Sequence, residues 1–214
     1  MTITRFTLIA AAGSLCAAAL AAEQATSPAS TPGTGSIRGR LSAPEGRQLP
    51  ETVVFLVASD PARTFPPPAQ HATFTQKEGK FIPQFQVIPV GQSVEFHNDE
   101  PTPLEHNVFS RSPAKQFDLG LCGPSAPAKP VLFDKPGEVA IFCSVHRYMD
   151  ATIYVAPTPF FAIADKDGNF EIKDVPPGDY TIKTWQRRKR LNDASEAVTV
   201  AAGQQAAKDL ALTR

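Results

Sequence analysis

The sequence predicts an all-β fold, a β-sandwich built from short strands. Proline accounts for 21 of the 214 residues, about twice its ordinary usage of about 5%, and proline in sheets is confined to edges and connections. Short runs of apolar and β-branched residues lie between the prolines, and no segment after the N-terminal region has the apolar period of an amphipathic helix. Short strands at this spacing are typical of a sandwich or a barrel.

The charge balance argues against one class of function. The chain has 21 basic and 21 acidic residues, whereas nucleic-acid-binding proteins usually carry a basic excess. Hydrophobic residues make up 42% of the chain and charged residues 20%, which is ordinary for a globular protein and unlike a disordered one. We therefore expect a folded protein with no nucleic-acid partner.

Residues 1–21 are predicted to be a secretory signal peptide. Arg5 supplies the positive charge, an apolar stretch rich in Ala and Leu follows, and Ala19 and Ala21 form a small-residue cleavage site. The apolar stretch is short for a membrane span, which needs about 20 residues. We expect export to the periplasm, no membrane span in the mature form, and a flexible leader over residues 22–35, which are rich in Ser, Thr, Pro, Ala and Gly.

The first domain is predicted over residues 36–156. The run TVVFLVA at residues 52–58 is apolar throughout, which is typical of a strand buried in a core. Further short apolar or alternating runs predict strands at 85–90, 93–96, 131–133, 138–142 and 152–155.

A second unit of β-strands is predicted over residues 157–214. Runs at 160–164, 170–175 and 180–185 are separated first by the hairpin pair Asp167-Gly168 and then by a Pro-Pro-Gly turn. The acidic residues before the first turn resemble part of a calcium-binding loop, but the glycine and the glutamate that an EF-hand requires are not in place. We therefore expect a turn there and no calcium site.

One short segment carries the distinctive chemistry of the chain. Cys143, His146 and Met149 have the spacing C-x2-H-x2-M, and His106 lies 37 residues before the cysteine in the segment EHNVF. Two imidazole nitrogens and one thiolate can form a trigonal plane around copper, with a thioether as a weak axial ligand. Structural zinc sites use cysteine and histidine and do not normally use a thioether. The segment therefore predicts one type 1 copper ion.

Two alternatives compete for these residues. His97 is also followed by an asparagine and is a rival to His106, which is favoured because it lies after the proline-rich turn in a segment with apolar residues. Loss of Cys16 with the signal peptide leaves Cys122 and Cys143, and two cysteines in an oxidising compartment ordinarily suggest a disulfide. The neighbouring histidine and methionine favour Cys143 as a copper ligand instead.

At these residues the sequence resembles the cupredoxins, and its loop spacing is similar to that of the amicyanin and plastocyanin-like members. The resemblance implies a Greek-key β-sandwich that holds copper through four side chains, the equatorial His106, Cys143 and His146 and the axial Met149. It also implies that Asn107 links the two ligand segments by hydrogen bonds.

The resemblance extends past the ligands. PTPFF after residue 156 and DKDGNF from residue 165 resemble a bacterial group labelled methylamine-utilisation proteins. In that group a cupredoxin core is joined to a carboxypeptidase-regulatory-like β module. Residues 36–60 and 160–212 resemble that module in style, which implies such an extension over residues 157–214.

These features predict a periplasmic electron carrier that exchanges one electron with redox partner proteins. The sequence has no nucleophile elbow, no P-loop and no dinucleotide-binding glycine motif, so we do not expect an enzyme. A copper-binding module for storage or delivery is an alternative that uses the same ligands. A structural sandwich with a Cys122–Cys143 disulfide is a further alternative.

Overall fold

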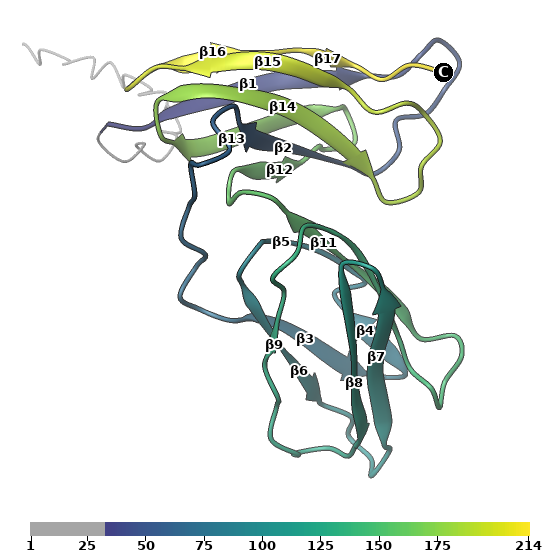
Figure 1. Ribbon diagram of the computed structural model, residues 1–214. Coiled ribbons are helices and arrows are strands. Elements are labelled where there is room, and N and C mark those ends of the chain that lie inside the picture. The colour runs from purple at the N-terminus through teal and green to yellow at the C-terminus, as the bar shows by residue number, and fades with distance from the viewer. Residues whose placement is uncertain (1–32) are drawn as a thin grey trace, which may run out of the picture.

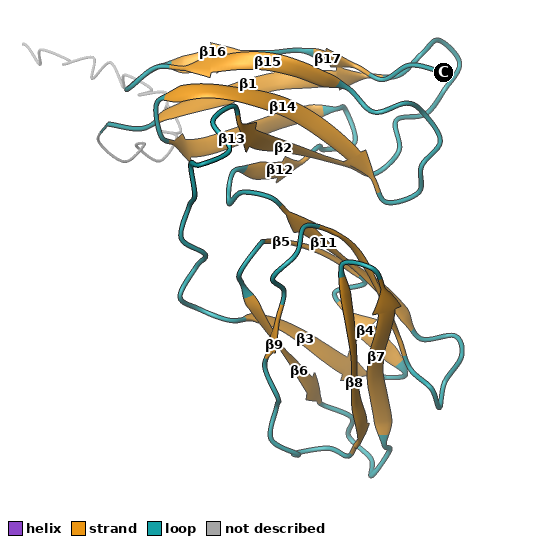
Figure 2. Cartoon of the chain, in the orientation of Figure 1, coloured by secondary structure: helices purple, strands orange, loops and turns teal. Residues whose placement is uncertain are grey.

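The structure, a computed structural model, describes residues 33–214, and every regular element in that range is a β-strand (Figure 2). The all-β class predicted from the sequence is confirmed. The predicted signal peptide, residues 1–21, and all but the end of the predicted leader lie outside the described residues. In the part of the chain that is described, no helix could cross a membrane.

The strands form two β-sandwiches, which Figure 1 shows as two lobes. We call the lobe built from residues 72–156 the inserted sandwich. Its five-stranded sheet, in the order β5-β11-β10-β7-β8, packs against a four-stranded sheet in the order β4-β3-β6-β9. Its strands are β3 (Ala72–Lys77), β4 (Lys80–Ile82), β5 (Phe85–Pro89), β6 (Ser93–Asn98), β7 (His106–Ser112), β8 (Lys115–Cys122), β9 (Val131–Leu132), β10 (Gly137–Phe142) and β11 (Asp150–Ala156).

The other lobe, the outer sandwich, contains strands from both ends of the described chain. One sheet has the order β13-β1-β16, with β17 also paired to β1, and the other has the order β12-β2-β14-β15. Its strands are β1 (Gly35–Ser42), β2 (Thr52–Ala58), β12 (Phe161–Ile163), β13 (Asn169–Val175), β14 (Gly178–Gln186), β15 (Ser195–Val200), β16 (Gln205–Ala207) and β17 (Leu210–Ala211).

The inserted sandwich interrupts the outer one between β2 and β12. Strand β2 pairs antiparallel with β12 and β14, and β1 pairs with β13, so residues 35–58 belong to the same sheets as the C-terminal strands. We expected one domain over residues 36–156 and a second unit over residues 157–214. The strand pairing differs for residues 35–58, which belong to the outer sandwich. The run at 52–58 is apolar throughout, and such a run carries no periodicity that would indicate its partner strand.

The two sandwiches share an interface that explains the two most apolar strands. Side chains of β2 alternate between the core of the outer sandwich, which takes Val54 and Leu56, and a cluster between the lobes, which takes Val53 and Phe55. Strand β11 is buried from residue 151 to residue 156 for the same reason. We call the cluster between the lobes the interface cluster; it contains Val53, Phe55, Val57, Phe85, Val87, Tyr154, Ala156, Phe161 and Trp185.

Candidate metal centre

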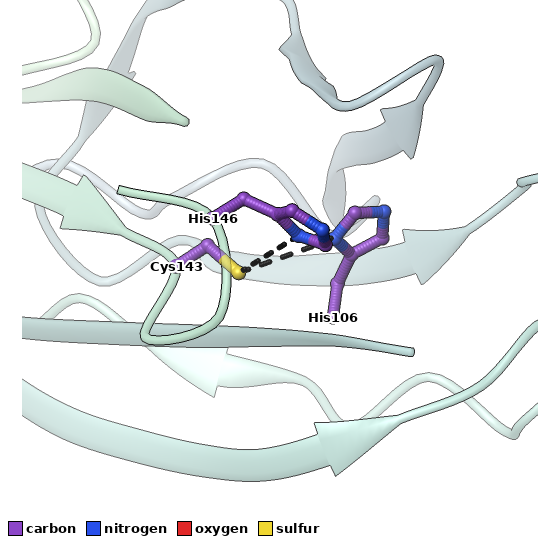
Figure 3. A group of neighbouring side chains, drawn as sticks. All are labelled: His106, Cys143 and His146. Atoms are coloured by element: carbon purple, nitrogen blue, oxygen red, sulfur yellow. Dashed lines mark hydrogen bonds between the residues drawn. The ribbon is translucent and has the colours of Figure 1, made fainter. Parts of the chain in front are cut away.

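Three side chains meet at one end of the inserted sandwich (Figure 3). His106 begins β7, Cys143 follows β10, and His146 lies in the connection to β11. The Sγ atom of Cys143 lies 3.9 Å from the Nδ1 atom of each histidine, and the two Nδ1 atoms are 3.0 Å apart. Metal–nitrogen and metal–sulfur bonds measure about 2.0 and about 2.3 Å, so one ion could contact all three atoms. Across residues 33–214 this is the group of histidine, cysteine or acidic side chains that could hold a metal.

Residues 143–149, the ligand loop, are closed by their own backbone. The N–H of Met149 donates to the carbonyl of His146 at 2.9 Å, and the N–H of Cys143 donates to the carbonyl of Met149 at 3.3 Å. Strands β10 and β11 stay paired as far as Phe142 and Asp150, which fixes both ends of the loop. Met149 is 1% exposed and belongs to the same buried cluster as Cys143. The tight turn therefore brings a thiol, an imidazole and a thioether together.

Asn107 makes contacts on both sides of the centre. Its backbone N–H points at the sulfur of Cys143 at 3.5 Å, and its side-chain oxygen accepts a hydrogen bond from the N–H of Ser144 at 3.4 Å. Its side-chain amide donates to Asp118 at 2.8 Å and to the carbonyl of Gly120 at 3.0 Å. The N–H of Gly120 and the amide of Asn107 hold the pKa of Asp118 below its usual range. These bonds connect β7 and β8 to the ligand loop.

A buried carboxylate that sequence reasoning missed contacts His106. The Oε1 atom of Glu100 lies 2.9 Å from Nε2 of His106, and Glu100 is 8% exposed. Glu100 also accepts hydrogen bonds from the N–H groups of Gly79 and Glu78. The Gly79 bond is the largest of the influences that hold the pKa of Glu100 below its usual range, although burial acts in the opposite direction. Nothing in the sequence distinguishes Glu100 from Glu105, which is exposed.

The structure separates the competing residues. His97 lies on β6, outside the metal-binding group, with its Nε2 atom 3.4 Å from a carboxylate oxygen of Glu95. Cys122 and Cys143 are both free thiols, so the alternative disulfide is not formed. Cys122 is paired with His106 across β7 and β8 and lines a largely apolar cavity of about 320 Å³.

The centre is buried except at one edge. His106 is 0% exposed and Cys143 is 4% exposed, whereas His146 is partly exposed. Three exposed apolar side chains lie in the ligand loop or directly before it, namely Phe142, Val145 and Tyr148, and the ring of Tyr148 lies 5.7 Å from that of His146. Figure 1 shows the ligand loop at the end of β11 that points away from the outer sandwich. The C-terminal strands therefore leave the His146 edge uncovered.

The donor set fits copper. A thiolate and two imidazoles are the equatorial donors of blue-copper sites, and a thioether is their usual weak axial donor. Met149 is buried in the loop that also provides Cys143 and His146. Structural zinc sites normally use four Cys or His ligands, and no fourth side chain of these types, nor a carboxylate, joins the group among the described residues.

Comparison with protein families and curated proteins gives one partial match. Residues 156–208 match the family described as polysaccharide lyase family 4, domain II. This range holds β12 to β16 of the outer sandwich. No curated protein matches the chain.

Several solved structures resemble part of the chain. A purple cupredoxin from Nitrosopumilus maritimus is 22% identical with a TM-score of 0.35, over 40% of this chain and 99% of that chain. A mutant plastocyanin of fern is 22% identical with a TM-score of 0.35, over 39% of this chain and 99% of that chain. A Cu-containing nitrite reductase from Thermus scotoductus SA-01 is 23% identical with a TM-score of 0.38, over 54% of this chain and 28% of that chain.

Proposed function

We propose that this protein is an exported type 1 copper protein that carries single electrons between redox partners in the periplasm. One observation carries the proposal. The sulfur of Cys143 and the Nδ1 atoms of His106 and His146 converge within 3.9 Å of one another in a preformed, largely buried group. Copper held there by these three residues and Met149 would supply a one-electron change between Cu(I) and Cu(II).

The residues around the group keep the donors in place. His106 and Cys143 extend from paired strands, and the backbone bonds of the ligand loop fix His146 relative to Met149. Asn107 links β7 to the loop and directs its N–H at the sulfur, where it stabilises a thiolate. A site whose donors are fixed in advance changes little between oxidation states, which is what electron transfer requires.

The partner is expected to dock at the His146 edge. His146 is the one proposed ligand that reaches the surface, and the ring of Tyr148 lies 5.7 Å from its imidazole ring. Phe142, Val145 and Tyr148 are 40%, 50% and 70% exposed. Small apolar surfaces of this kind suit the weak, short-lived complexes of redox proteins.

Burial favours a carrier over a storage or delivery module. A module that hands over its metal needs ligands that an acceptor can reach. His106, Cys143 and Met149 are 0%, 4% and 1% exposed, which leaves only His146 accessible.

The test is reconstitution of the mature protein with Cu(II). We expect an intense blue colour, one copper per chain, and repeated reduction and reoxidation without metal loss. Cys143→Ser should abolish the colour, and the matched control Cys122→Ser should keep it. A colourless complex would refute the type 1 site, and transfer of copper to an acceptor chelator on reduction would favour delivery.

A further inference from the structure

Glu100 is a buried carboxylate held by three donors. Its side chain is 4% exposed, and it accepts hydrogen bonds from Gly79 N–H at 2.8 Å and from Glu78 N–H at 3.0 Å. These two residues form the β3–β4 turn and have φ values of 66° and 54°, as in a tight hairpin turn. The side chain of Asn98 accepts the backbone N–H of Glu100 at 3.1 Å. Hydrogen bonds therefore hold Glu100 at its backbone N–H as well as at its carboxylate oxygens.

The third donor to Glu100 is His106. An ionised carboxylate can only accept hydrogen bonds, so the 2.9 Å contact with Nε2 places the imidazole proton on that nitrogen. The Nδ1 atom then carries the lone pair, and it is the atom that lies near Cys143 and His146. This is the tautomer in which His106 can bind a metal through Nδ1.

A carboxylate in this position acts on the metal as well as on the ring. It raises the basicity of the imidazole and adds a negative charge where water does not screen it. Both effects favour Cu(II), the more highly charged ion. A neutral acceptor would orient the ring in the same way without adding the charge.

We propose that Glu100 is a positioning residue that selects the Nε2–H tautomer of His106 and that its charge lowers the reduction potential of the centre. The inference rests on the proposed copper function. It assigns the two effects to different properties of one side chain: the tautomer to an acceptor oxygen beside Nε2, and the potential to the negative charge. The two can therefore be separated by substitution.

The first test measures the reduction potential of full-length, copper-loaded variants. Substitutions near a metal ligand typically change metal affinity by about tenfold or more. We therefore expect E100Q to lower the affinity for Cu(II), relative to the affinity for Cu(I), by at least that factor. For a one-electron couple this is a rise of about 59 mV. The matched control E95Q removes a charge from β6, where Glu95 contacts His71 and His97; it should shift the ratio less than threefold. Equal shifts in E100Q and E95Q would overturn the assigned role of the charge.

The second test needs no copper. Nitrogen NMR of the metal-free full chain should show the proton of His106 on Nε2 in the wild type. E100Q keeps an acceptor oxygen and should keep this tautomer, whereas E100A should show a mixture of both. A proton on Nδ1 in the wild type, or an unchanged tautomer in E100A, would overturn the positioning role. If the wild type takes up no Cu(II), the proposed function fails, and the NMR result still decides the role of Glu100.

Discussion

The Nδ1 atoms of His106 and His146 lie 3.0 Å apart, although 40 residues separate them in the chain. Because Glu100 holds the proton of His106 on Nε2, the hydrogen bond between the two rings runs from Nδ1–H of His146 to Nδ1 of His106. Both nitrogens therefore point to one position beside the thiol of Cys143. A metal ion would take the place of the proton between them.

Replacement of His106 should remove the copper signature. We expect His106→Ala to abolish the blue absorption, because the buried nitrogen donor is lost from the group. His97→Ala is the matched control and should keep the colour, since His97 lies outside the group beside Glu95. Visible absorption and electron paramagnetic resonance would measure both variants. Loss of colour in the His97 variant alone would reverse the assignment.

Asn107→Ala should weaken both stability and the copper site. The substitution removes the acceptor for Ser144 N–H and the donor to Asp118 and Gly120, and leaving buried polar partners unsatisfied costs about 1–3 kcal/mol. Urea unfolding of the metal-free protein would measure the loss. Asp118→Asn keeps an acceptor oxygen and should lose less. Equal stability of N107A and the wild type would contradict a linking role for this side chain.

The two cysteines in the described range should differ in reactivity. Cys122 is partly exposed and Cys143 is 4% exposed, and neither forms a disulfide. A bulky thiol reagent should therefore label Cys122 in the native metal-free protein and both residues after unfolding. Mass spectrometry of peptides would locate the label. Rapid labelling of Cys143 in the native protein would show that the ligand loop opens.

Truncation of Tyr154 should destabilise the contact between the two sandwiches. Its ring stacks on Trp185 at 4.3 Å and contacts Phe55, and burial raises the pKa of its hydroxyl. Tyr154→Ala should cost about 3–5 kcal/mol, as for other buried aromatic residues, whereas Tyr154→Phe should cost under about 1.5 kcal/mol. Fluorescence of Trp185, the single tryptophan, would follow unfolding. Similar losses in both variants would show that the hydroxyl, not the ring, matters.

Asp165 should contribute stability that depends on pH. Its carboxylate accepts N–H groups of Asp167 and Asn169 in the β12–β13 turn. The Asn169 side chain and these N–H groups lower its pKa from 3.8. Because the folded-state pKa is the lower one, the contribution is fully present above the unfolded-state value and is lost as the pH falls through the folded-state value. Melting temperatures of Asp165→Ala and the wild type should therefore differ at neutral pH and converge in acid. A pH-independent difference would contradict this.

The sequence was most informative where one physical signal dominates. The apolar run of β2 predicted a buried strand, which is present. The residue types of the ligand loop predicted metal ligands, and the structure brings Cys143 and His146 together with His106 in a group that could hold a metal. Strand β3 was missed because the buried Gln76 interrupts its apolar alternation. Glu100 was missed because its role depends on the β3–β4 turn, which is distant in sequence. Hydrophobic burial alone did not specify the partners of β2, whereas the resemblance of residues 36–60 and 160–212 to one β module agrees with its pairing with β12 and β14.

The insertion of one sandwich into the other also sets an order of folding. Glu51 and Arg187, which form an ion pair at one edge of the outer sandwich, are 136 residues apart in the chain. Long loops of this kind close slowly, because their entropy must be overcome before any contact forms. The strands of the inserted sandwich all lie within residues 72–156 and pair only with one another, so they can pair without the C-terminal strands. The proposed copper ligands can therefore come together before β1 and β2 pair with the C-terminal strands.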